Sequence, residues 1–149
     1  MIVHDALVPP AGAHRYRCRV YFEDTDAAGV VYYANYLKLA ERARTEALRD
    51  HGVPHAELTA LHGLIFMVRR AKLDYLRPAR LDDSLVVATW PKAIGAASVE
   101  LAQTFHREGD TGGALVVAEV LLACVRQSDM RAARMPVRWR DALARLDDR

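Results

Sequence analysis

The chain has 149 residues, 52% of them hydrophobic and 27% charged, and its 21 Lys and Arg against 19 Asp and Glu give a net charge of +2. This length suits one domain that folds without disulfides or metals. The balanced charge argues against a nucleic-acid binder, and no apolar run approaches the roughly 20 residues that span a bilayer, so we expect no membrane insertion. Cys18 and Cys124 lack the spacing of a zinc site, and the N-terminus lacks a secretory pattern. We therefore expect a cytoplasmic protein with reduced thiols.

The first residues divide into an arm, a strand and a turn. Residues 1–14 contain two prolines and a glycine, which favour a flexible arm ahead of a single domain over residues 15–149. Residues 15–22 alternate between apolar and polar side chains, the pattern of a strand with one solvated face. Residues 24–29 contain Asp, Thr and Gly, which are typical of a turn that leads out of this strand.

A long helix is predicted from about Asn35 to about His51. Its apolar side chains recur at steps of three and four, and the resulting stripe consists of Tyr36, Ala40, Ala43 and Ala47. Because three of these four side chains are small, we expect the helix to approach a sheet closely. Gly52 and Pro54 provide the signal that ends the helix.

The rest of the chain is predicted to be mainly strands joined by short turns. The predicted strands cover residues 65–76, 85–90, 97–106 and 114–125, and a short helix is predicted over 139–146. The apolar phase of the first of these strands switches near Arg69 and Arg70, which indicates a bulge. Consecutive strands with tight turns form an antiparallel sheet, so with one long helix packed across it the fold class is α+β.

Asp24 and Asp26 are the first candidates for chemistry, because they lie between the predicted strand and the long helix. A carboxylate near a helix N-terminus is close to unpaired N–H groups and to the positive end of the helix dipole. Such a carboxylate could activate water or attack a substrate, while a helix N–H holds the developing oxyanion. Alternatively, both aspartates are ordinary turn and capping residues.

Aromatic and basic residues give weaker signals. Tyr32, Tyr33 and Tyr36 could line an acyl or aryl pocket, but tyrosines at helical spacing also pack against sheets. Six basic residues could hold the phosphates of a nucleotide-like carrier or form a solvated face, namely Arg69, Arg70, Lys72, Lys92, Arg131 and Arg134. Glu119 interrupts an apolar strand, and we expect a structural ion-pair partner for it.

Residues 19–52 have the sequence RVYFEDTDAAGVVYYANYLKLAERARTEALRDHG. This segment resembles the hot-dog-fold acyl-CoA thioesterases, in the branch that includes hydroxybenzoyl-CoA thioesterase and the bacterial Tol-Pal-associated thioesterases. Residues 66–83 and 118–125 resemble later strands of the same family, so the likeness extends over residues 15–136. It implies a long central helix wrapped by a curved antiparallel sheet of about five strands. It also implies a homodimer with a continuous sheet and active sites at the dimer interface, and the pairing of dimers into a homotetramer.

The resemblance also assigns roles around the turn. Asp26 matches the essential carboxylate of the family, and Tyr33 lies where a main-chain N–H polarises the thioester carbonyl. The residues expected to contact substrate are Gly29, Val30, Tyr32, Tyr36, Arg69 and Lys92. A tyrosine at position 33 is the residue of the hydroxybenzoyl-CoA branch, whereas the Tol-Pal-associated branch usually has His there. Gly95 lies where the family often has an arginine that binds the carrier phosphates. The implied reaction is hydrolysis of a short-chain or aryl acyl-CoA, with no metal and no cofactor beyond the coenzyme A of the substrate.

Two alternatives stay open at this point. Another hot-dog branch carries its catalytic carboxylate on the central helix, which makes Glu41 and Glu46 the alternative site, although their helix face is predicted to be polar rather than directed at a pocket. The same fold could serve a non-catalytic protein that binds an acyl carrier or an envelope complex. Hydration of enoyl-CoA is disfavoured, because the Asp/His motif of those enzymes has no match here.

Overall fold

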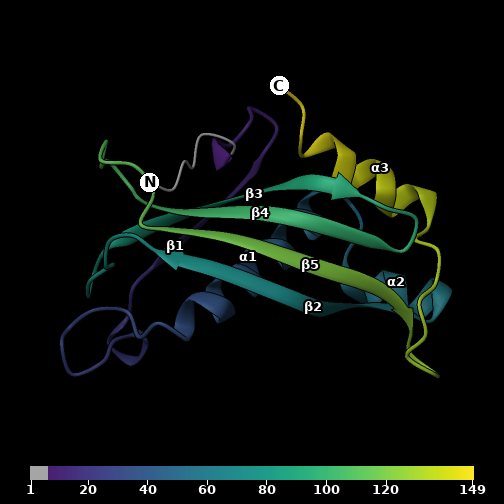
Figure 1. Ribbon diagram of the computed structural model, residues 1–149, viewed down its shortest axis with the longest axis horizontal. Helices are drawn as coiled ribbons and strands as arrows, with labels where there is room; N and C mark the ends of the chain where they lie inside the picture. The colour runs from purple at the N-terminus through teal and green to yellow at the C-terminus, as the bar shows by residue number, and fades with distance from the viewer. Residues whose placement is uncertain (1–6) are drawn as a thin grey trace.

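The computed structural model describes residues 7–149, which form a five-stranded antiparallel sheet and three α-helices (Figure 1). The strands are β1 (His14–Arg19), β2 (Leu64–Tyr75), β3 (Ser84–Ile94), β4 (Ser98–Arg107) and β5 (Val116–Arg126), and their order across the sheet is β1-β3-β4-β5-β2. The helices are α1 (Asn35–Asp50), α2 (His55–His62) and α3 (Val137–Arg145). This arrangement confirms the predicted α+β architecture of one long helix against five antiparallel strands.

The long helix α1 packs along one face of the sheet, behind the strands in the view of Figure 1. The predicted apolar stripe is buried: Tyr36 is 3% exposed, Ala47 is 2% exposed, and the two alanines between them are fully buried. Because the alanine side chains are short, α1 can lie close to β1 and β3, the strands that it contacts most extensively. Gly52, with a φ of 76°, adopts the left-handed conformation that follows many helix ends. The predicted helix bounds are confirmed to within one residue.

The edge strand β2 contains the predicted bulge. Its pairing with β5 shifts register between Val68 and Arg70, so Arg69 has no partner residue on β5. The extra residue returns the apolar side chains to one face, and Val68 before the bulge therefore lies on the same face as Leu73 after it. Within the described chain, the other edge of β2 has no neighbouring strand.

Strand β3 is longer than the sequence predicts. The prediction ends it at Trp90, but the strand continues through Pro91 to Ile94. β1 pairs with β3 only as far as Thr89, so the missing N–H of Pro91 removes no hydrogen bond on that side. The pairing with β4 shifts register directly after Pro91. A proline is thus tolerated here because half of β3 has only one neighbouring strand.

The N-terminal residues that the structure describes pack on the domain. Leu7 is 9% exposed and belongs to the main core, and the Gly12 N–H donates to the carbonyl of Asp148 at 2.7 Å. The sequence predicts a flexible arm over residues 1–14; its first six residues lie outside the described residues, and the rest is held against the C-terminal segment. From residue 7 to residue 149, no helix is both long and apolar enough to cross a membrane.

Candidate active site

The chain between β1 and α1 is a loop that its own hydrogen bonds hold in place. β1 ends three residues before the predicted strand end, and a short 3-10 helix (η2, Phe22–Asp24) follows it. The carboxylate of Asp24 accepts the Tyr21 N–H at 2.8 Å. Its main-chain carbonyl accepts the Tyr32 N–H and the side-chain amide of Asn35, both at 2.9 Å. Of the two candidate aspartates, Asp24 is therefore the one that holds the loop.

Asp26 follows in an exposed turn that leaves part of its carboxylate available. Its Oδ1 accepts the Ala28 N–H at 2.9 Å, and its own N–H donates to the carbonyl of Val30 at 3.0 Å. Gly29 completes the turn with a φ of 78°, which side chains disfavour, and donates its N–H to the Asp26 carbonyl at 3.0 Å. No residue in the described part of the chain hydrogen-bonds to Oδ2. Asp26 thus keeps one oxygen free for chemistry.

A pocket of about 320 Å³ lies between this loop, the start of α1 and the end of β2. It is lined by Asp26, Val30, Val31, Tyr33, Tyr36, Tyr75, Leu76, Arg77 and Pro78. The structure therefore brings together four of the predicted site residues, Asp26, Val30, Tyr33 and Tyr36. Gly29 shapes the turn beside them.

The main-chain N–H of Tyr33 is a free donor at the start of α1. It forms no hydrogen bond with any residue of the described range 7–149, whereas the Asn35 N–H donates to the carbonyl of Tyr32 at 2.8 Å. The Tyr33 carbonyl accepts the Tyr75 hydroxyl at 3.2 Å, which ties the loop to β2. Because Tyr33 lies two residues before the first residue of α1, the aligned peptide dipoles make the potential there positive. The residues that line the pocket thus include one with a free main-chain N–H and one with a free carboxylate oxygen.

Tyrosine rings form one wall of this pocket. The centroid of the Tyr75 ring lies 6.3 Å from that of Tyr33 and 5.6 Å from that of Tyr36. The hydroxyl of Tyr36 accepts the Ala79 N–H at 3.2 Å, and burial raises the pKa of this phenol. Tyr36 is therefore part of the core as well as of the wall. Tyr32 packs on Tyr33 with a centroid distance of 4.8 Å and lies outside the pocket lining.

The predicted basic contacts lie elsewhere. Lys92 forms an ion pair with Glu119 at 2.9 Å, which confirms the structural partner expected for Glu119. Arg69 is exposed at the β2 bulge, and neither it nor Lys92 lines the pocket. The guanidinium that does line it is that of Arg77, which hydrogen bonds fix to the hairpin turn between β4 and β5. Sequence reasoning missed Arg77, although it lies in residues 66–83, which carry part of the family resemblance.

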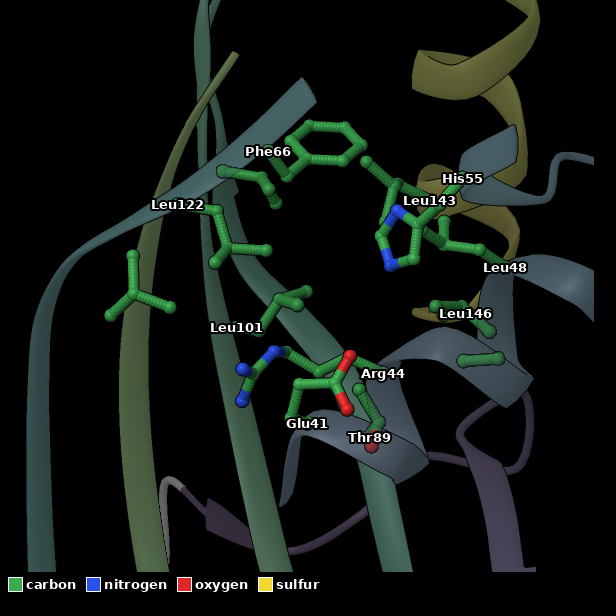
Figure 2. Close-up of a pocket in the computed structure, with 13 residues that line it drawn as sticks. Glu41, Arg44, Leu48, His55, Phe66, Thr89, Leu101, Leu122, Leu143 and Leu146 are labelled. Atoms are coloured by element: carbon green, nitrogen blue, oxygen red, sulfur yellow. The ribbon is translucent and has the colours of Figure 1, made fainter. Parts of the chain in front are cut away.

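A second cavity of about 100 Å³ lies further along α1, between the three helices and the sheet (Figure 2). Glu41 lines it together with Arg44 and His55, so the prediction that the Glu41 face of the helix is not directed at a pocket is wrong. The sequence does not reveal this cavity because most of its wall comes from the strands β2 to β5 and from the C-terminal region at α3, which lie far from Glu41 along the chain. Glu46 lies outside the cavity lining and forms an ion pair with Arg49.

The fold and the pocket define a class of protein. A long helix lies against a five-stranded antiparallel sheet, and one pocket is lined by Asp26 and by Tyr33, which lies just before the helix start. Residues 28–114 match the family model described as the thioesterase superfamily. The chain therefore belongs to the thioesterase superfamily and has its hot-dog fold, which confirms the resemblance seen in the sequence.

Similarity to individual relatives indicates the reaction within this superfamily. The acyl-CoA thioester hydrolase YbgC of Escherichia coli O6:H1 is 41% identical over 122 residues, which cover 82% of this chain and 89% of that one. A 1,4-dihydroxy-2-naphthoyl-CoA hydrolase of Thermosynechococcus vestitus is 32% identical over 117 residues, or 78% and 79% of the two chains. The crystal structure of a probable thioesterase from Bartonella henselae gives a TM-score of 0.76 at 33% identity, over 83% of this chain and 99% of that one. The chain is accordingly an acyl-CoA thioester hydrolase.

Proposed function

We propose that the enzyme hydrolyses short-chain or aryl acyl-CoA thioesters in the pocket between the loop, α1 and β2, with Asp26 as the catalytic carboxylate and the Tyr33 N–H as the oxyanion donor. The observation that carries this proposal is that Asp26, with a free carboxylate oxygen, and Tyr33, with a free main-chain N–H, line the same pocket. The tyrosine wall supplies apolar surface of a size that suits a short aliphatic or aryl group. The name of one relative, an acyl-CoA thioester hydrolase, supports a CoA thioester as substrate, and the name of another, a 1,4-dihydroxy-2-naphthoyl-CoA hydrolase, supports an aryl acyl group. A CoA thioester as substrate also favours a cytoplasmic location.

Asp26 can start the reaction by either of two routes. As a general base, its free oxygen takes a proton from a water molecule while that water attacks the thioester carbonyl. As a nucleophile, the same oxygen attacks the carbonyl and forms a mixed anhydride, which water then hydrolyses. In both routes the carbon–sulfur bond breaks and the electron pair leaves with sulfur as the CoA thiolate. Because a thiolate is a good leaving group, no separate strong acid is required.

The Tyr33 N–H stabilises the negative charge that develops on the carbonyl oxygen in both routes. A donor that is already oriented and lies in the positive field of a helix start needs no reorganisation when this charge appears. Since the donor belongs to the main chain, the side chain at this position is free to shape the acyl pocket instead. The hydrogen bond from Tyr75 to the Tyr33 carbonyl holds the peptide plane on the other side of the residue.

A panel of CoA thioesters tests the substrate class. Free thiol release from acetyl-, butyryl-, benzoyl- and palmitoyl-CoA gives kcat/KM for each, and we expect the highest values for the butyryl or benzoyl ester. A sixteen-carbon chain extends well past the tyrosine wall that contacts the acyl group, so palmitoyl-CoA is expected to be the poorest substrate. A maximum at palmitoyl-CoA would contradict the proposed substrate class.

We further propose that the enzyme is a homodimer that pairs into a dimer of dimers, with β2 at the first interface. β2 has 12 residues, and its outer edge has no partner in the described chain. A long unpaired edge is a template for another strand, so two copies of β2 would continue one sheet. Val68 and Tyr75 on this strand are each 48% exposed, and Tyr75 lines the Asp26 pocket. A second copy on β2 would therefore stand beside that pocket.

Sedimentation equilibrium tests this assembly. We expect the mass of two or four chains at micromolar concentration, because pairing covers the exposed edge and apolar side chains of β2. Specific activity is expected to fall on dilution in step with the appearance of single chains. A single-chain mass with undiminished specific activity would contradict the proposed dimer.

A further inference from the structure

We propose that the cavity between α1, α2, α3 and the sheet is a binding site for a small carboxylate with a short apolar body, and that Arg44 holds the carboxylate. This site is distinct from the Asp26 pocket within one chain. Arg44 lies nine residues beyond the first residue of α1, which corresponds to about 14 Å along the helix axis. The two pockets have no lining residue in common.

Arg44 is a buried cation whose guanidinium is hydrogen-bonded to an amide oxygen rather than to a carboxylate. Arg44 is only 9% exposed, and its Nη1 donates a hydrogen bond to Oε1 of Gln103 at 3.1 Å. The amide nitrogen of Gln103 donates to the Ala40 carbonyl and to the Thr89 hydroxyl, both at 3.0 Å, and these bonds keep its oxygen directed at Arg44. Arg44 forms no ion pair with any residue in 7–149. Because an unpaired charge away from water is unfavourable, this arrangement favours an anion as ligand.

The rest of the cavity wall is mostly apolar. Figure 2 shows Phe66, Leu101 and Leu122 of the sheet facing Leu48, Leu143 and Leu146 of the helices, with Arg44 at one end of the space between them. A cavity of about 150 Å³ is large enough for benzene in another protein, so the volume here, about 100 Å³, suits a body of roughly four non-hydrogen atoms. The ligand is therefore a carboxylate with a short aliphatic body rather than a long-chain one.

Two further ionisable groups line the cavity, and neither removes the positive charge of Arg44. Glu41 is exposed to water, which screens its charge, and its Oε1 accepts the Thr45 hydroxyl at 2.8 Å. That hydroxyl has one hydrogen, so at 3.1 Å it accepts the hydrogen bond of the His55 Nε2–H. Burial lowers the pKa of His55, which favours its neutral form at pH 7. The charge of Glu41 attracts that of Arg44 and partly opposes the lowering of its pKa by burial, but the buried guanidinium has no carboxylate of its own chain within hydrogen-bond distance in the described residues.

The carboxylate could arrive in either of two molecules. It could be a free short-chain acid, such as the product of the proposed hydrolysis, or the far end of an acyl group that carries a carboxylate. The second source needs a second subunit. If two copies of β2 pair antiparallel about a two-fold axis, the Phe66 end of one strand faces the Tyr75 end of the other. This cavity of one subunit would then lie next to the Asp26 pocket of its partner.

Calorimetric titration of the full-length protein tests the site, with butyrate as the probe and butyramide as its neutral isostere. We expect butyrate to bind at least tenfold more tightly than butyramide. Arg44→Met is expected to weaken butyrate binding at least tenfold, whereas Arg42→Met, an exposed arginine on α1 outside the cavity lining, leaves it unchanged. Equal binding of acid and amide, or no effect of Arg44→Met, overturns the proposal.

A second variant covers the case in which Arg44→Met does not fold. Leu122→Phe adds volume on the sheet side of the cavity, so we expect it to abolish butyrate binding without touching Arg44. If this folded variant binds butyrate as the wild type does, the cavity is not the site.

Inhibition of thioester hydrolysis by butyrate distinguishes the two sources. Competitive inhibition that Arg44→Met relieves assigns the cavity to the far end of the acyl group, because product bound in the Asp26 pocket would not depend on Arg44. Inhibition that lowers kcat alone and that Arg44→Met relieves assigns the cavity to a free acid. Because butyrate binding is measured without turnover, it is also measurable in Asp26→Asn, and failure of the catalytic proposal is distinguishable from failure of this one.

Discussion

Asp26→Asn is expected to lower the hydrolysis of butyryl- or benzoyl-CoA by about 10²–10⁴-fold, because the amide can neither take a proton from water nor attack a carbonyl. The turn itself should survive this change. An Asn Oδ1 can still accept the Ala28 N–H, and the main-chain hydrogen bonds of the turn do not involve the side chain. Thiol release gives kcat for the variant, and circular dichroism with sedimentation checks that fold and assembly are intact.

Two matched variants separate chemistry from a general effect of charge. Glu23→Gln removes a carboxylate from the same loop but outside the pocket lining, and we expect it to retain wild-type kcat. Glu41→Gln removes the carboxylate that lines the second cavity, and we expect a far smaller loss of kcat than in Asp26→Asn. An active Asp26→Asn enzyme together with an inactive Glu41→Gln enzyme would move the catalytic carboxylate to the helix.

The parts of this fold that could be predicted from sequence depend on neighbours close along the chain. The buried face of α1 follows from apolar spacing within a few helical turns, and the bulge at Arg69 follows from a phase switch within one strand. The turn that carries Asp26 is equally local. Which of the two aspartates holds the loop does not follow from a residue pattern, because it depends on the loop conformation that lets Tyr32 and Asn35 donate hydrogen bonds to the Asp24 carbonyl.

The features that the sequence could not reveal depend on elements far apart along the chain. Pro91 fits within β3 because β1, more than seventy residues earlier, stops short of it. Arg77 is fixed beside the Asp26 pocket by the turn between β4 and β5. Glu41 lies on an exposed helix face, and the cavity that it lines is completed by Phe66, Leu101 and Leu143, which come from segments well after α1. The burial of Arg44 in the same cavity has the same origin. For this reason no sequence motif predicts the second cavity.

Removal of the Tyr33 N–H is the second change with a large expected effect. Tyr33→Pro eliminates this donor, and we expect kcat to fall about 10²–10³-fold, which corresponds to about 2.7–4 kcal/mol of lost oxyanion stabilisation. Tyr33→Ala is the matched control, since it removes the ring but keeps the N–H. If the donor is the main chain, kcat of Tyr33→Ala stays far above that of Tyr33→Pro, while KM changes with the altered acyl wall.

An ester at the same position separates the loss of the donor from the restraint that proline places on the backbone. Incorporation of the α-hydroxy analogue of tyrosine at position 33 replaces N–H by oxygen and retains the ring, and the carbonyl that accepts the Tyr75 hydroxyl remains in place. We expect this protein to lose kcat as Tyr33→Pro does, with KM close to that of the wild type, because the donor acts on charge that exists only in the transition state. A wild-type kcat in the ester variant would assign oxyanion stabilisation to another group of the pocket.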